Sequence, residues 1–181
     1  MSATDSLHYR LCLEGARWLR HTRRRERCRT LPCNRRELCL MCYACKWVTV
    51  EIVTVAAENT DVWGFDGFYS TVIEVKTSRA DFLADKKKRC RNINEDFQTG
   101  NMRWYLCPEG LIRPDELPDG WGLLYWDGKS VVPVAPPKRR LAGCHGDAII
   151  LGSIMRRERV PFGIYNYRSN ADINDKPNKT K

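Results

Sequence analysis

Two carboxylates and a lysine stand at spacings that suit metal-assisted hydrolysis. Asp61 precedes Glu74 by thirteen residues, and Lys76 follows Glu74 two positions later. Alternate residues of a strand point to the same face, so Glu74 and Lys76 would stand side by side, about 6 to 7 Å apart along the strand. Carboxylates form an oxygen site that suits Mg²⁺ or Mn²⁺, and a neighbouring lysine can orient or deprotonate the attacking water. These groups favour phosphodiester hydrolysis.

Glu14 is a further acidic candidate. It lies in the middle of a helical apolar stripe formed by Leu7, Leu11, Gly15 and Trp18. Burying a carboxylate without a partner is costly, so such a group usually meets a metal, an arginine or a cluster that needs it. Glu14 could therefore complete the acidic cluster. The alternative is a glutamate at the edge of the core that pairs with a nearby arginine.

The elements that would hold these residues alternate between strand and helix patterns. The predicted helices cover residues 7–25, 78–91 and 147–159, with a helical turn at 114–117, and the predicted strands cover 47–55, 61–65, 70–76, 103–107, 121–126 and 130–134. Asp66, which competes with Asp61 for the acidic role, precedes Gly67 and suits a tight turn between two strands better. The order predicts one mixed α/β domain over residues 1–165 and a disordered tail over 166–181.

At this point the sequence resembles a known family, the PD-(D/E)XK or restriction-endonuclease-like nuclease superfamily. The matching residues are Thr60-Asp61 and Glu74-Val75-Lys76. Further stretches are similar to a subgroup of small bacterial and phage nuclease-like proteins, and they lie at 61–64, 73–82, 105–112 and 120–125. The resemblance covers roughly residues 7 to 135. Thr60 stands where the pattern usually has proline, which changes the stiffness of the loop and leaves the chemistry intact.

The resemblance implies a mixed central β-sheet flanked by helices and a Mg²⁺-dependent endonuclease (a hydrolase) acting on DNA, with double-stranded DNA as the partner. Asp61 and Glu74 would bind the metal, Lys76 would serve the water, and Glu14 would be the acid carried by the first helix. Cutting both strands often needs two active sites, so a homodimer is one assembly that fits. Folds host varied functions, so two alternatives stay open: a non-catalytic nucleic-acid binder, and a phage or defence interaction protein built on the same fold.

A cysteine-rich segment predicts a second metal. Five cysteines crowd into eighteen positions, namely Cys28, Cys33, Cys39, Cys42 and Cys45. In a reducing compartment such crowding favours metal binding over disulfides, and four thiolates complete a tetrahedral zinc site. The run at 39–45 also fits an iron–sulfur cluster, and unliganded thiols are a third option. Bound zinc would brace an insertion at about residues 26–46 and would do no chemistry.

The positive charge is concentrated next to those cysteines. The net charge is +9, and residues 17–36 hold nine arginines and one acid, which amounts to +8. So local a charge favours a polyanionic partner, although a solvated arginine face is the alternative. The residues predicted to contact nucleic acid are Arg23, Arg24, Arg25, Arg35, Arg36, Arg79, Lys86 and Lys87.

No stretch suggests a membrane protein or an exported one. No apolar run approaches the ~20 residues that a membrane span needs. Residues 38–45 follow two arginines and faintly mimic a signal peptide, but they are internal and contain three cysteines. The expected location is the cytoplasm of a bacterial or phage-infected cell.

Overall fold

The structure is a computed structural model that describes residues 6–21, 44–56, 58–85, 98–140 and 145–160. Within these residues the elements follow in the order α1 (Leu7–His21), β1 (Trp47–Ile52), β2 (Thr60–Phe65), β3 (Ser70–Val75), α3 (Arg79–Asp85), β4 (Met102–Pro108), the 3₁₀ turn η4 (Pro114–Glu116), β5 (Trp121–Trp126), β6 (Val131–Ala135) and α4 (His145–Arg157).

The six strands form one mixed sheet, in the spatial order β1-β2-β3-β4-β5-β6. Strands β1, β2 and β3 are antiparallel neighbours. Strand β4 lies parallel to both β3 and β5, and β6 returns antiparallel to β5. Parallel neighbours need a crossover connection, which α3 begins between β3 and β4. The fold is α/β, as the sequence predicts.

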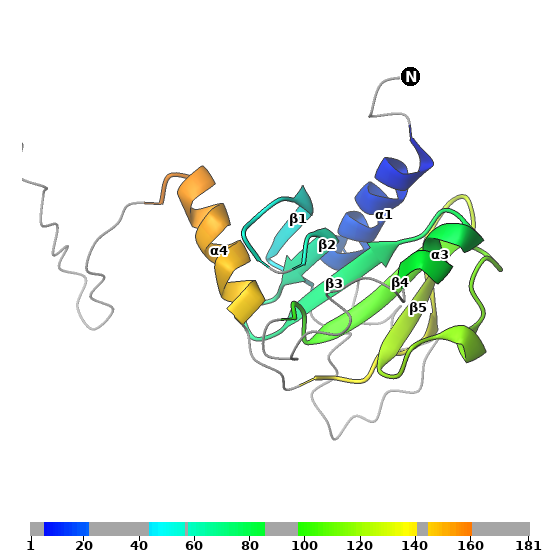
Figure 1. The fold of residues 1–181 in the computed structure, drawn as a ribbon. Coiled ribbons are helices and arrows are strands. Elements are labelled where there is room, and N and C mark those ends of the chain that lie inside the picture. The colour runs from blue at the N-terminus through cyan, green and yellow to red at the C-terminus, as the bar shows by residue number, and fades with distance from the viewer. Residues whose placement is uncertain (1–5, 22–43, 57, 86–97, 141–144, 161–181) are drawn as a thin grey trace, which may run out of the picture.

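Helices cover both faces of this sheet (Figure 1). Helix α1 packs on one face, where Leu11 and Leu19 meet Val62, Ile73 and Leu106. Side chains alternate along a strand, so the neighbouring residues of β2, β3 and β4 face the other way. On that second face α4 contributes Ile150 to a cluster with Trp63 and Val72. Helix α3 covers another part of it through Phe82, which packs against Tyr105.

Short polar residues begin the first two helices. The Ser6 hydroxyl accepts a hydrogen bond from the Tyr9 N–H, and the Ser78 hydroxyl accepts one from the Asp81 N–H. Such N-caps supply partners to N–H groups that lack one inside the helix. The Asp66 carboxylate does the same in the tight turn, where it accepts from the N–H groups of Phe68 and Tyr69. The turn predicted from the Asp66-Gly67 pair is confirmed.

Each predicted strand is present, and the largest shift is at the end of β1. This strand ends at Ile52 instead of residue 55, next to Glu51, whose φ of 47° lies in the left-handed region. Helix α4 starts at His145, two residues earlier than expected, and Asp147 lies in its first turn. Asp147 is buried and accepts hydrogen bonds from Trp63 Nε1 at 2.7 Å and Ser70 Oγ at 2.8 Å, which ties α4 to β2 and β3.

Several predictions fall on residues outside the described ranges. They are the extensions of the first helix to residue 25 and of the second to residue 91, most of the insertion at 26–46, and the tail at 166–181. Among the described helices, none combines the length and apolarity that crossing a membrane requires.

Candidate active site at the end of strand β3

Glu74 and Lys76 form an adjacent acid–amine pair inside the protein. Lys76 Nζ lies 3.6 Å from Glu74 Oε2, and each side chain is only 2% exposed. Ile73 and Val75 point to the opposite face and join the core under α1. The Lys76 N–H donates to the Leu106 carbonyl oxygen at 2.9 Å, which continues the parallel pairing with β4. Glu74 and Lys76 stand side by side as expected, and both side chains are buried.

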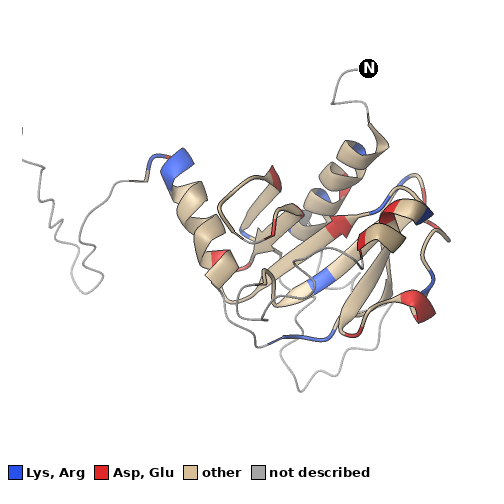
Figure 2. Ribbon diagram, viewed as in Figure 1, with Lys and Arg blue, Asp and Glu red and all other residues tan. Residues whose placement is uncertain are grey.

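Two aspartates of α3 complete the surroundings of Lys76. Asp85 Oδ1 lies 3.0 Å from Lys76 Nζ, and Asp81 Oδ1 lies 3.8 Å from it. Asp85 is fully buried and also accepts a hydrogen bond from the Tyr105 hydroxyl at 2.7 Å. Figure 2 shows acidic and basic positions next to each other at the end of β3, with further acidic positions on α3. A buried ammonium needs such partners, because losing its hydration is costly.

Asp61 is fixed to the backbone of the strand that carries Glu74. Its Oδ2 accepts a hydrogen bond from the Val75 N–H at 2.7 Å and lies 3.5 Å from His8 Nε2. The register that pairs Val62 with Ile73 places Asp61 opposite Glu74. These contacts bring all three predicted residues, Asp61, Glu74 and Lys76, to one end of the β2–β3 hairpin.

The electrostatics of Asp61 reflect the same neighbours. Burial by itself would raise the pKa of the Asp61 carboxyl, but the hydrogen bonds from His8 and Val75, together with the charges of His8 and Lys76, hold that pKa below its usual value. The hydrogen bond with Asp61 in turn raises the pKa of His8, against the opposing effect of burial. Asp61 is therefore an anion at neutral pH, which suits a metal ligand.

Glu14 does not join this cluster. Its carboxylate lies 2.5 Å from Arg17 Nη1, one turn further along α1, and its side chain is 23% exposed. The residue of α1 that reaches Asp61 is His8. Six residues separate the two positions, which amounts to about 9 Å along the helix axis and a rotation of about 120°. The expected role of Glu14 as a helix-borne catalytic acid is replaced by the other interpretation, an acid paired with arginine.

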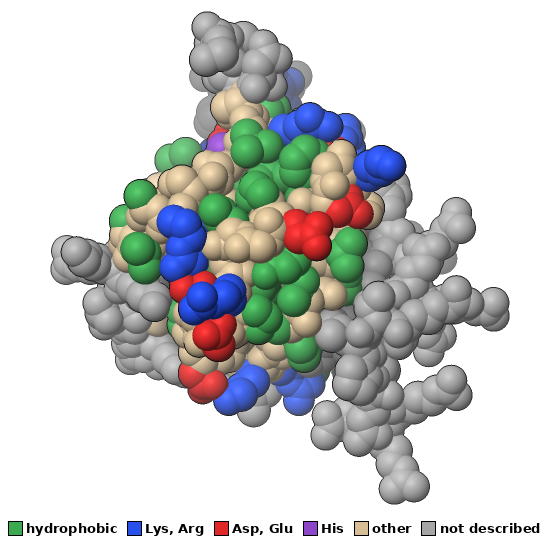
Figure 3. Space-filling model, turned by 90° about the vertical axis from the view of Figure 1, so that its right-hand side faces the viewer, with side chains coloured by type: hydrophobic (Ala, Val, Ile, Leu, Met, Phe, Trp, Pro, Cys, Tyr) green, Lys and Arg blue, Asp and Glu red, His purple; other side chains and the backbone are tan. Residues whose placement is uncertain are grey.

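Of the residues predicted to contact nucleic acid, the structure describes Arg79. Its guanidinium forms two hydrogen bonds with the Glu116 carboxylate, at 2.8 and 2.6 Å, and donates to the Leu111 carbonyl oxygen. Figure 3 shows acidic and basic side chains next to each other on this side of the molecule. This pairing does not favour Arg79 as a phosphate contact. The other predicted contacts lie outside the described residues: Arg23, Arg24, Arg25, Arg35, Arg36, Lys86 and Lys87.

Of the five clustered cysteines, the structure describes Cys45. It is 4% exposed and packs in the core with Leu19, and a side chain on Gly64 would collide with its Sγ at 2.9 Å. Cys28, Cys33, Cys39 and Cys42 lie outside the described residues.

The sequence interpretation missed Asp85, Tyr105 and His8. Asp85 shares a helix face with Phe82, since residues three apart are neighbours on a helix, and the apolar Phe82 indicates that this face points inward. That spacing could have marked Asp85 as a buried acid. No signal identifies Tyr105 or His8 as neighbours of Lys76 and Asp61, because both contacts join distant parts of the chain.

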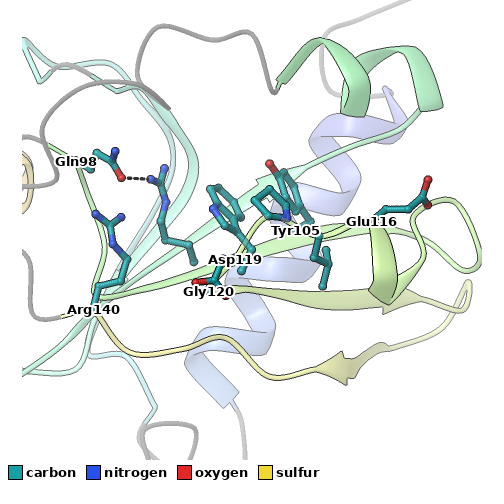
Figure 4. A pocket seen from close by; sticks show the side chains of 10 residues that line it. Gln98, Tyr105, Glu116, Asp119, Gly120 and Arg140 are labelled. Atoms are coloured by element: carbon teal, nitrogen blue, oxygen red, sulfur yellow. Dashed lines mark hydrogen bonds between the residues drawn. The ribbon is translucent and has the colours of Figure 1, made fainter.

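A pocket of about 470 Å³ lies beside the site. Its lining residues are Gln98, Arg103, Tyr105, Glu116, Leu117, Pro118, Asp119, Gly120, Trp121 and Arg140 (Figure 4). Tyr105 belongs both to this lining and to the contact with Asp85. Arg103 is buried in its wall, donates to Gln98 Oε1 at 2.9 Å and forms an ion pair with Glu58. Tyr105 therefore lies between the pocket and Asp85 of the acidic cluster.

No family model matches the sequence, and no curated protein matches it. Among solved structures, the SPO1766 protein of unknown function from Silicibacter pomeroyi is similar, with 22% sequence identity, a TM-score of 0.45, and coverage of 66% of this chain and 84% of that one. A likeness of this extent carries no argument about function. The class that fold and geometry define is an α/β protein with a buried acid–amine pair at the end of a central strand.

Proposed function

We propose that the protein is a divalent-metal-dependent nuclease of the PD-(D/E)XK kind that hydrolyses phosphodiester bonds in DNA. One observation carries the proposal: Glu74 and Lys76 are buried together at the end of β3, and Asp61 is bound to the backbone of the same strand. Burying charged groups is costly, and packing alone would be served better by apolar residues. A chemical role for the three groups is therefore the more economical explanation.

The residues fit a divalent ion of the Mg²⁺ type. Asp61 and Glu74 supply carboxylate oxygens, and Mg²⁺ is usually bound by one or two carboxylates while it keeps several waters. The surroundings are also strongly acidic. The carboxylates of this region are Glu51, Asp61, Glu74, Asp81 and Asp85, whereas the basic groups between them are Lys76 and His8. Such an excess of negative charge favours a bound cation. When bound, the ion would polarise the phosphoryl group and acidify a water.

The protein's own residues would orient the reaction. Lys76 Nζ lies within 4 Å of carboxylate oxygens of Glu74, Asp81 and Asp85, which hold the ammonium where it would orient a water or stabilise charge on the phosphoryl group. The Val75 N–H fixes the Asp61 carboxylate at 2.7 Å. Asp81 keeps 41% of its side chain exposed and Asp61 keeps 23%, so the cluster opens to solvent on their side.

A groove between α1, β1 and α4 is the proposed path for the DNA backbone. It has a volume of about 800 Å³, and its charged lining residues are Arg17, Arg20, Lys46 and Arg157 beside Glu51 and Glu158. Arg17 pairs with Glu14, and Arg20 and Arg157 donate to backbone carbonyl oxygens, so Lys46 is the basic group proposed to meet a phosphate first. The segment that follows α1 holds the densest run of arginines in the sequence. Basic side chains along a groove bind the phosphate backbone regardless of base sequence. The same groove would also serve a non-catalytic nucleic-acid binder, the second candidate function.

Plasmid nicking tests the proposal. Supercoiled DNA is incubated with the full-length protein and Mg²⁺ or Mn²⁺, beside EDTA, and the relaxed form is quantified over time. We expect nicking with the metals and none with EDTA. Asp61→Asn should lower the rate by about 10²-fold or more, because the substitution removes a charged ligand while its remaining oxygen can still accept from Val75.

Asp119→Asn is the matched control. Asp119 is an exposed acid at the neighbouring pocket, and its ion pair is with Lys138 rather than with the groups of the site, so its loss should leave the rate unchanged. Equal nicking by wild type and Asp61→Asn would refute the assignment of the site. Metal-independent DNA binding without any nicking would favour the non-catalytic binder, and neither binding nor nicking would favour a phage or defence interaction protein.

A further inference from the structure

Three side chains of metal-binding type meet on the other side of Asp61. His8 and Cys12 lie four residues apart on α1 and therefore share a helix face, and Glu51 reaches them from β1. Their ligand atoms lie within 4.8 Å of one another. Among the described residues, these three form the one group of His, Cys, Asp or Glu side chains close enough together to hold a metal ion. None of the three belongs to the proposed Mg²⁺ site.

Two of the three separations match the edges of a tetrahedral zinc site, and the third, between Cys12 Sγ and Glu51, is at most 4.8 Å. Zinc binds nitrogen at about 2.0–2.1 Å and sulfur at about 2.3 Å, so tetrahedral angles put a nitrogen and a sulfur ligand about 3.6 Å apart, and a nitrogen and an oxygen ligand about 3.4 Å apart. His8 Nδ1 lies 3.7 Å from Cys12 Sγ and 3.5 Å from Glu51 Oε1. An ion could be bound between the three atoms with little movement of α1 or β1.

The second nitrogen of His8 has the partner that a metal-bound imidazole usually has. Metal-ligating histidines almost always donate their other ring N–H to a carboxylate, a carbonyl or a water, which fixes the tautomer and the ring orientation. His8 Nε2 lies 3.5 Å from Asp61 Oδ2. Nδ1 therefore faces Cys12 and Glu51 while Nε2 faces Asp61, so the imidazole connects the two clusters.

Charge and exposure favour an ion at this place. The pairing of Val50 with Val62 and of Ile52 with Thr60 puts Glu51 opposite Asp61, and like charges opposite each other destabilise a sheet. A cation next to Glu51 would offset that repulsion. Cys12 is fully buried, whereas the side chains of His8 and Glu51 are 34% and 49% exposed. An ion could therefore enter from solvent past His8 and Glu51.

We propose that His8 Nδ1, Cys12 Sγ and a Glu51 carboxylate oxygen bind a zinc ion, with a water as the fourth ligand. A thiolate and an imidazole select zinc over magnesium, which prefers oxygen ligands. The site shares no residue with the oxygen site at Asp61 and Glu74. Burial and the charges of Asp61 and Glu51 raise the pKa of the Cys12 thiol, so zinc binding releases the thiol proton to solvent as the Zn–S bond forms.

Cobalt substitution tests this site in the full-length protein. Metal-stripped protein is titrated with Co²⁺, which reports tetrahedral thiolate ligation through its charge-transfer and d–d absorption bands, and bound cobalt is counted after gel filtration. Because the cysteines at 28–45 can add equivalents of their own, each variant is compared with wild type. Cys12→Ser, His8→Ala and Glu51→Gln should each bind one equivalent fewer. Cys107→Ser removes a different buried thiol and should bind as many equivalents as wild type.

His8→Ala and Glu51→Gln alter partly exposed side chains, so both variants should fold, and melting curves without metal verify this. The proposal is overturned if His8→Ala and Glu51→Gln bind as much cobalt as wild type, or if Cys107→Ser loses an equivalent as well. The count is independent of nuclease activity. A protein that binds this equivalent but never nicks DNA with Mg²⁺ would refute the nuclease proposal and leave the zinc site intact.

Discussion

Asp85 Oδ1 lies closer to Lys76 Nζ, at 3.0 Å, than the Glu74 carboxylate that the sequence pairs with it, at 3.6 Å. Asp85 comes from α3, whereas Glu74 and Lys76 come from the end of β3. Helix α3 thus supplies the nearest carboxylate to the ammonium, and the Tyr105 hydroxyl of β4 donates a hydrogen bond to that carboxylate. The geometry of Lys76 depends on three elements at once.

Asp85→Asn should therefore destabilise the fold. The substitution keeps the shape of the side chain but removes the charge that faces Lys76 inside the protein, and hydrogen bonds to charged groups contribute about 1.5–3 kcal/mol. Urea unfolding should show a loss of about that size. Asp81→Asn is the matched change, since Asp81 lies 3.8 Å from Lys76 and is 41% exposed, and it should cost less than about 1 kcal/mol. Equal losses for the two variants would contradict the role given to Asp85.

Glu14→Gln should leave nuclease activity within about twofold of wild type, because Glu14 pairs with Arg17 at the surface of α1 and does not contact Asp61, Glu74 or Lys76. The measurement is the rate of plasmid nicking at saturating Mg²⁺. A loss of 10²-fold or more, the scale expected for a catalytic acid, would restore Glu14 to the site and require α1 to lie differently from the structure described above.

Asp147 should make stability depend on pH in a direction opposite to most acids. Burial raises the pKa of this carboxyl above its ordinary value of 3.8, although hydrogen bonds from Trp63, Ser70 and Gly100 oppose the rise. The folded state therefore retains a proton that the unfolded state releases, and the contribution of Asp147 to stability is complete below pH 3.8 and is lost as the pH rises through the folded-state pKa.

The difference in unfolding free energy between wild type and Asp147→Asn isolates this effect. As the pH rises from about 3 to 7, the unfolding free energy of wild type should fall relative to that of Asp147→Asn. The fall should be about 1.4 kcal/mol for each unit by which the folded-state pKa is raised. Denaturant unfolding of both proteins at several pH values provides the measurement. A difference that stays constant, or that moves in favour of wild type, would contradict the raised pKa.

DNA binding through the groove between α1, β1 and α4 should weaken with salt. Each phosphate contact releases counterions, so the logarithm of the binding constant should fall linearly with the logarithm of the salt concentration. Lys46→Ala should reduce that slope by about one, because Lys46 lines the groove. Arg79→Ala should leave the slope unchanged, because Arg79 is paired with Glu116. Fluorescence anisotropy of labelled duplex DNA gives both slopes, and a salt-independent affinity would exclude the proposed path.

The sequence was sufficient for the strands and for the position of Asp61, Glu74 and Lys76, because alternation and turn residues act locally. Ser70–Val75 and the Asp66-Gly67 turn need no distant information. Periodicity also placed Glu14 near the apolar face of α1, but it could not say which acid or base would stand beside it. Asp85, Tyr105 and His8 reach their partners only after α3, β4 and α1 have packed against the sheet, so tertiary contacts decided what local patterns left open.

The most direct test of the central claim concerns Lys76. Removing Lys76 alone would leave buried acids without their cation, so Lys76→Met is combined with Asp85→Asn, and this double variant is compared with Asp85→Asn in the plasmid-nicking assay with Mg²⁺. If Lys76 serves the attacking water, Asp85→Asn nicks DNA and the double variant is slower by about 10²- to 10⁴-fold. Equal rates of nicking by the two folded variants would contradict the account.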